Sequence, residues 1–200
     1  MPVRSLFLAC VLALCCTGPA DAQAVTWTID PGHSSGQFTV RHMLVANVRG
    51  EFDGPTGTIT FDPADFKTLK VDVSFDTKSV NTRNPDRDKD LRSDLFFDIA
   101  KYPKMTFKSK RAEPSGPGRL KLIGDLTIKG VTKEVILEVE GPTPEIKDIW
   151  GERRIGATAT TTIDRRQFGL MYNRMLEGGG AVVGDTVNVT IDVEMTRKGG

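Results

Sequence analysis

Three residues near the start of the chain have the side chains of a hydrolase triad. Asp30, His33 and Ser34 supply a carboxylate, an imidazole and a hydroxyl within five positions. Neighbouring residues on a strand point to opposite faces, so His33 is badly placed to take a proton from Ser34. We therefore expect Asp30 and Ser34 to bond the backbone of a turn at Pro31-Gly32 rather than to perform catalysis.

The two histidines, His33 and His42, are the first candidates for a metal site. A zinc site needs a third protein ligand, and the spacing of the pair puts them on opposite faces of a regular strand. His42 follows Phe38 and Val40 on one face, where it is either a core histidine or a contact for the polar end of a ligand. We expect no metal ligand here.

A run of alternating aspartates, Asp86, Asp88 and Asp90, resembles the start of a calcium loop. The sixth position is Leu91 rather than glycine, and the twelfth is Phe97 rather than glutamate. A solvated helix face explains the aspartates better. The sequence thus predicts no catalytic residue, no cofactor and no enzyme activity.

Strands must position these residues, because the dominant hydrophobic period is two. The C-terminal run from Thr186 to Thr196 is the strongest case, with apolar side chains at every odd position. Similar faces occur in the segments 26–29, 35–43, 48–52, 57–61, 71–76, 105–107, 120–128, 134–140 and 157–163. This pattern predicts about eight main strands and a short one at 26–29.

Turns and helices complete the expected architecture. Lys129-Gly130 joins two alternating runs, so it predicts a hairpin and antiparallel neighbours. Segment 63–69 has room for one or two helical turns. Segment 84–98 is the better helix candidate, because Pro85 suits a first helical position and acidic residues follow it. Long strands favour a barrel over a sandwich, and we expect an all-β, eight-stranded antiparallel barrel with one or two short helices.

Small residues on inward positions bear on whether such a barrel is filled. An eight-stranded barrel has an interior just wide enough for side chains or one slender ligand. The small inward residues either leave room for a ligand or mark bulges and bends: Gly36, Gly50, Gly124, Ala157 and Ala159. Likewise, the apolar clusters 95–97 and 168–172 either plug the ends of the barrel or line a ligand entrance.

The two ends and the charge balance limit the compartment and the partners. Arg4 and the apolar run 6–16 predict a signal peptide over residues 1–22, and a second A-x-A site places the cut at residue 24. All three cysteines lie in this segment. Residues 23–200 then form a single domain. The formal net charge is +1 with the two signs interspersed, so a nucleic-acid partner is not expected. No later segment is apolar over the roughly 20 residues of a membrane span, so stable membrane insertion is not expected either.

A series of motifs in this chain resembles the YceI family, in order and over nearly the whole of the expected mature domain. The motifs are Trp27-Thr28-Ile29-Asp30, His33-Ser34, 38–42, Gly50-Glu51-Phe52, Gly57 with Phe61-Asp62-Pro63, 79–82 with Arg87-Asp88, 93–98, Tyr102-Pro103 with Thr106-Phe107, 124–133, Asp164-Arg165 with Phe168-Gly169-Leu170, and Val183-Gly184-Asp185. The stretch 171–180 departs from this pattern, so the resemblance assigns no residue there.

The resemblance implies a lipocalin-like barrel exported to the periplasm, a homodimer, and an elongated cavity for a polyisoprenoid, an isoprenoid quinone or another long-chain amphiphilic lipid. It brings no catalytic residues. Our candidates for the cavity wall are Phe38, Val40, His42, Phe75, Phe107, Leu126 and Ile128, with Arg41 and His42 at the head group. Two alternatives stay open: a packed interaction module without a ligand, and an enzyme that acts on the lipid.

Overall fold

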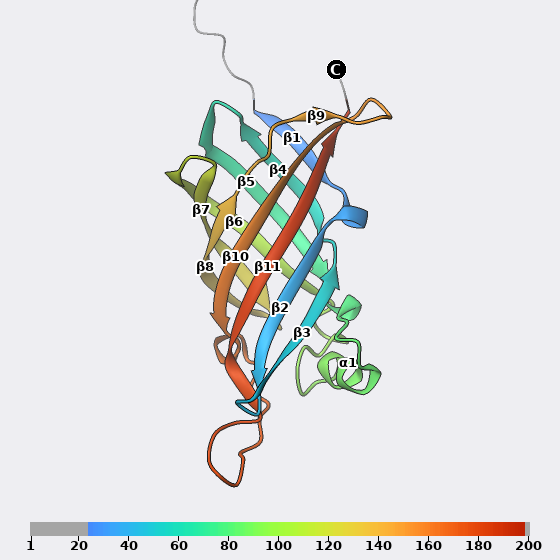
Figure 1. Ribbon diagram of the computed structural model, residues 1–200, viewed down its shortest axis with the longest axis vertical. Coiled ribbons are helices and arrows are strands. Elements are labelled where there is room, and N and C mark those ends of the chain that lie inside the picture. Colours follow the sequence, from blue (N-terminus) through green and yellow to red (C-terminus); the bar gives the residue numbers. More distant parts are fainter. Residues whose placement is uncertain (1–23, 199–200) are drawn as a thin grey trace, which may run out of the picture.

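The strands of the protein form one closed antiparallel barrel (Figure 1). The computed structural model describes residues 24–198, and the expected signal peptide lies outside this range. The strands are β1 (Val25–Ile29), β2 (Ser35–His42), β3 (Ala46–Asp53), β4 (Thr56–Asp62), β5 (Asp65–Asp76), β6 (Lys104–Gly116), β7 (Arg119–Ile128), β8 (Val131–Glu140), β9 (Ile146–Lys147), β10 (Arg153–Asp164) and β11 (Val183–Arg197).

Closure of the barrel runs through β11, the strand with the strongest alternation in the sequence. β11 pairs with β10 on one edge, and with β2 and the end of β1 on the other. β1 and β2 follow one another along that edge and together act as one bent strand. β4 pairs with β1 and β3 pairs with β2, so β3 and β4 together act as a second bent strand. Counted this way, the barrel has eight strands, and the predicted fold class is confirmed.

The long axis of the barrel separates two ends that the following sections call upper and lower. The upper end carries the C-terminus and the short strand β9, and the lower end carries the helix α1 (Pro85–Arg92) and the 171–182 loop (Figure 1). Three short 3-10 turns join the strands: η1 (Pro31–His33), η2 (Thr77–Ser79) and η3 (Arg165–Phe168). Within residues 24–198, no helix is long and apolar enough to cross a membrane.

The helix α1 is held by polar contacts and is shorter than expected. The Asn84 side chain caps its first turn by accepting from the Arg87 backbone N–H. Asp88, expected on a solvated face, is instead buried and accepts hydrogen bonds from the Thr82 N–H and hydroxyl, at 2.8 and 2.5 Å. The helix ends at Arg92, and the chain then turns so that Phe97 enters the core.

The expected helical turns at residues 63–69 are wrong. A turn at Pro63-Ala64 leads directly into β5, which begins at Asp65. Phe66 and Leu69 both face the barrel interior although they lie three positions apart, a spacing that would put them on opposite faces of a regular strand. The pairing of β4 with β5 shifts register in this region, and such an irregularity gives a strand the spacing of a helix turn.

Three inward glycines seat aromatic rings. The Phe75 ring lies over Gly36 and the Phe107 ring over Gly124, so that a Cβ at either glycine would come within 2.7 Å of a ring carbon. Gly50 lies in the same way beneath Phe38. These glycines thus neither leave open space nor simply bend the strand. They let large rings approach the backbone of another strand closely inside a narrow barrel.

Replacing Gly50 with alanine tests this seating. A Cβ there would meet the Phe38 ring and also lie 2.7 Å from Thr82 Cγ2, so Gly50→Ala should lower the free energy of unfolding by about 1–3 kcal/mol. Chemical denaturation measures this change. The matched control is Gly178→Ala, where a Cβ has no atom within 4 Å. Equal stability of the two variants would show that the ring does not need the glycine.

Candidate functional site

An apolar cavity runs through the interior of the barrel. Its volume is about 260 Å³, and the surface that its wall presents is apolar. On β11 the lining residues extend from Val183 to Met195, which is about 40 Å of strand at roughly 3.3 Å per residue. The cavity is therefore long and narrow, and its shape suits an extended chain better than a compact molecule.

Six residues predicted for the cavity wall do line the cavity: Phe38, Val40, Phe75, Phe107, Leu126 and Ile128. Whether they contact a ligand stays a prediction. The prediction omitted a large share of the wall, which β10 and β11 supply through Ala157, Ala159, Thr161, Ile163, Val187, Val189, Ile191, Val193 and Met195. Their alternation was visible in the sequence, so these positions were within reach of the same reasoning.

The predicted head-group residues lie elsewhere. His42 is half-buried and outside the set of residues that line the cavity, and Arg41 is exposed. Arg41 donates instead to the Leu44 carbonyl at 3.1 Å and to Asn47 Oδ1 at 3.2 Å. The pairing of β2 with β11 shifts register between Val183 and Val187, beside the end of β2, and His42 follows Val40 there without reaching the cavity wall. The inward face of β2 therefore ends at Val40.

The lower end of the cavity is closed by the two apolar clusters singled out in the sequence. Phe97, Phe168 and Leu170 are buried in one core cluster there. Phe97 and Leu170 also line the cavity, as does Phe96, whose ring lies 5.1 Å from that of Tyr172. The expectation that these segments plug the end of the barrel is confirmed, and some of the same residues border the cavity. Whether they line a ligand entrance stays a prediction.

Arg165 is the one charged residue among the described residues that line the cavity, and the sequence analysis did not single it out. It is 3% exposed. Its guanidinium donates to the carbonyls of Gly184, Leu170 and Val183 and to Asp185 Oδ1. Burial lowers the pKa of Arg165, while the carboxylate of Asp185 opposes that shift. These bonds fasten the lower plug to β11, since they join the η3 turn to the start of that strand.

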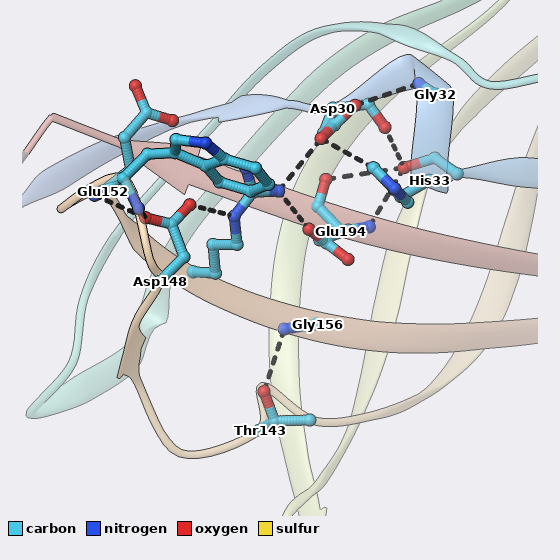
Figure 2. A network of polar contacts seen from close by, with 11 residues as sticks. Asp30, Gly32, His33, Thr143, Asp148, Glu152, Gly156 and Glu194 are labelled. Carbon is cyan, nitrogen blue, oxygen red and sulfur yellow. Dashed lines mark hydrogen bonds and ion pairs between the residues drawn. The ribbon is translucent and has the colours of Figure 1, made fainter.

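A second polar group lies on the outer wall near the upper end (Figure 2). Arg154 donates to Asp148 Oδ2 at 2.6 Å, to Asp30 Oδ2 at 3.0 Å and to the carboxylate of Glu194. His33 Nδ1 lies 2.9 Å from Asp30 Oδ2. Asp148 also accepts the backbone N–H of Glu152, so this network ties the loop between β8 and β10 to the barrel wall.

The oxygen and nitrogen atoms of Asp30, His33 and Glu194 lie within 4.8 Å of one another, as a cation site would need. The Arg154 guanidinium already supplies the positive charge between the two carboxylates. An ion-pair network explains the cluster, and it carries no metal site.

Ser34 is not a nucleophile in this arrangement. The run Gly32-His33-Ser34-Ser35-Gly36 has the glycine and serine spacing of a nucleophile elbow. That elbow joins a strand to a helix, whereas this run leaves a 3-10 turn and enters a strand. The Ser34 hydroxyl donates to the Asp30 carbonyl at 2.7 Å and accepts the Glu194 N–H at 3.0 Å. Its role is to hold the turn, as expected.

The pair of His33 and Asp30 predicts a pH dependence. The hydrogen bond between His33 and Asp30 raises the pKa of His33 above the ordinary 6.5. A raised pKa in the folded state gives stability that is present below pH 6.5 and lost as the pH rises through the folded value. NMR titration should show His33 titrating above 6.5, and Asp30→Asn should lower that value. A His33 pKa at or below 6.5 would contradict the pairing.

The comparisons with known proteins agree with this architecture. The sequence pattern of the YceI-like domain matches residues 27–195. A UPF0312 protein of Staphylococcus aureus strain USA300 is 35% identical over 170 residues, which cover 85% of this chain and 96% of that protein. The crystal structure of a Campylobacter jejuni YceI protein superimposes with a TM-score of 0.66 at 34% identity, over 80% of this chain and 90% of that chain. A Saccharophagus degradans domain described as polyisoprenoid-binding shares the fold, with a TM-score of 0.60 at 17% identity, over 84% and 97% of the two chains. The chain therefore belongs to the YceI-like domain family.

Proposed function

We propose that this protein is a binding and carrier protein for a long-chain amphiphilic lipid, a polyisoprenoid or an isoprenoid quinone, held in the barrel cavity. The observation that carries the proposal is the long, narrow and apolar interior. A buried methylene contributes about 0.8 kcal/mol of transfer free energy, so a chain of many carbons binds strongly without specific polar contacts. The Saccharophagus degradans domain of the same fold, described as polyisoprenoid-binding, supports this choice of ligand.

The volume and the wall narrow the kind of ligand. At about 260 Å³ the cavity lies near the lower bound of ordinary ligand pockets, roughly 300 Å³. Aromatic rings and β-branched side chains fill most of the cross-section, which leaves space for a slender chain. A polar head group then belongs at an end of the barrel, where Arg165 is the charged residue that borders the cavity.

Catalysis on the lipid is less well supported by the same residues. Acid–base chemistry needs a titratable group that reaches the reacting atoms. Among the described lining residues, the polar side chains are Gln37, Thr106, Thr161 and Arg165. The Arg165 guanidinium already donates its hydrogen bonds to the lower plug.

The interaction-module alternative predicts that side chains repack to fill the interior and that the protein binds no ligand.

Export to the periplasm as a homodimer belongs to the same proposal. Residues 1–22 would be removed as the signal peptide, and residues 23–200 would form the mature domain. A carrier outside the cytoplasm would exchange its lipid with a membrane that faces the same compartment.

Filling the cavity tests the proposed function. Ala159 lines the cavity on β10, and the next residue, Thr160, is exposed. Ala159→Trp places an indole in the ligand volume and should weaken binding of an isoprenoid quinone at least about tenfold, since the chain and the ring compete for one space. Titration of detergent-solubilised quinone, followed by fluorescence, measures this affinity. Thr160→Trp is the matched control on the outer face and should bind like the parent protein. Equal binding by both variants would show that the cavity is not the ligand site.

Fractionation of the source cells tests the export. The intact mass of the protein from the periplasmic fraction should correspond to a chain that begins near Gln23 or Val25. A full-length protein that remains in the cytoplasm would contradict this part of the proposal.

A further inference from the structure

Five exposed apolar side chains cover the tips of two loops at the lower end of the barrel. In the β2–β3 turn, Met43, Leu44 and Val45 have exposed fractions of 43%, 59% and 77%. In the 171–182 loop, Met171 and Met175 are 63% and 75% exposed. We call these five residues the lower-rim patch. Single exposed apolar residues are ordinary, whereas a group of them on adjacent tips marks an interaction surface.

The two loops form one surface, as their shared end of the barrel indicates (Figure 1). The Met43 N–H donates to the Val182 carbonyl at 2.8 Å, and the Val182 N–H donates to the Arg174 carbonyl at 2.9 Å. The Leu44 side chain lies against Gly180, where a Cβ would approach Leu44 Cδ1 to 2.8 Å. The two loops that carry the patch are therefore joined by backbone hydrogen bonds and by the contact of Leu44 with Gly180.

The turn at the tip adopts a conformation that its residues do not favour. Met43 and Leu44 have φ angles of 48° and 63°, and the Val45 N–H closes the turn on the His42 carbonyl. Two-residue turns with both φ angles positive favour Asn and Gly, because a Cβ is strained there. The hairpin at Lys129-Gly130 has the same pair of positive angles and places glycine second. Local stability therefore does not explain the long apolar side chains at this tip.

The patch adjoins the cavity. Leu170 lines the cavity and directly precedes Met171, and Val183 lines it and directly follows the 171–182 loop. Buried Phe97, Phe168 and Leu170 close this end, so a chain leaves here only when that plug moves aside, and it then meets the apolar side chains of the patch. This continuity suits the exchange of a lipid between the barrel and an apolar environment.

The charges beside the patch are mainly positive. The segments 41–45 and 171–182 contain two arginines, Arg41 and Arg174, against one acidic residue, Glu177. Within residues 24–198 neither arginine forms an ion pair with a carboxylate. Apolar side chains flanked by arginines that have no carboxylate partner among the described residues fit the boundary between acyl chains and phosphates of an anionic bilayer.

We propose that the lower-rim patch docks on the surface of an anionic phospholipid bilayer, and that the ligand passes between membrane and cavity at this end. The docking stands on the patch itself, and the passage of ligand rests on the proposed function. The opposite end also exposes Ile146, Ile149 and Trp150. That loop differs from the lower-rim patch, because the Arg154 network ties it to the outer wall and its Trp150 ring lies 5.9 Å from the Arg154 guanidinium.

The test is flotation of the purified protein with vesicles of phosphatidylglycerol and phosphatidylethanolamine at low salt. The variant combines Met43→Asn with Leu44→Gly, which removes two apolar side chains and suits the turn. We expect its partition into vesicles to fall at least about tenfold, while its thermal midpoint is equal to or above that of the parent protein. A loss of binding then cannot come from loss of folding.

The matched control combines Ile146→Asn with Ile149→Gly at the upper end and should keep its vesicle binding within about twofold of the parent protein. Absence of vesicle binding by the parent protein would overturn the docking. So would a loss confined to the control, or a tip variant that only converts a dimer to a monomer, which would make the patch an interface between copies.

Uptake of quinone from detergent separates the two proposals. The tip variant should take up quinone from detergent like the parent protein but more slowly from vesicles. If the parent protein binds vesicles but no quinone, the proposed function and the exchange step fail, and the docking stands.

Discussion

Closure of the sheet is the constraint on which the rest of the structure depends. Once β11 pairs with β10 on one edge and with β1 and β2 on the other, every inward side chain must share a narrow cylinder. Phe38, Phe75 and Phe107 fit because a glycine on another strand of the barrel lies beneath each ring. The remaining space is a thin apolar channel. The proposed ligand class, the choice of wall residues and the need to plug the ends are all consistent with that geometry.

The two ends of the barrel are held by different contacts. At the lower end, buried aromatic residues and the Arg165 guanidinium close the channel from within. At the upper end, the outer network around Arg154 holds a loop against the wall, with three carboxylates around one guanidinium. The hydrogen bond from Arg154 lowers the pKa of Asp148. The hydrogen bond with His33, and after it the one from Arg154, lower the pKa of Asp30. The ends are thus fixed by polar contacts, which leaves the interior apolar along its length.

Much of the fold could be predicted because alternation is a local signal. The alternation from Val187 to Met195 predicts which side chains of that run face inward, and the structure confirms that face. The same rule failed where register changes. Phe66 and Leu69 have the spacing of a helix turn beside an irregular pairing, and His42 lies outside the cavity wall beside a second register shift, between Val183 and Val187. The glycine seats and the Arg154 network depend on which strands are neighbours, and a single sequence does not encode that in any local pattern. The partner Glu194 of Ser34 lies 160 positions away.

The central claim is that the channel holds a long-chain lipid, and the most direct test is to extract the protein purified from its native compartment without added lipid. Organic extraction followed by mass spectrometry should find an isoprenoid or isoprenoid quinone in a stoichiometric amount. An empty extract, unchanged after the protein is offered isoprenoids in detergent, would contradict the claim and identify the barrel as a packed interaction module.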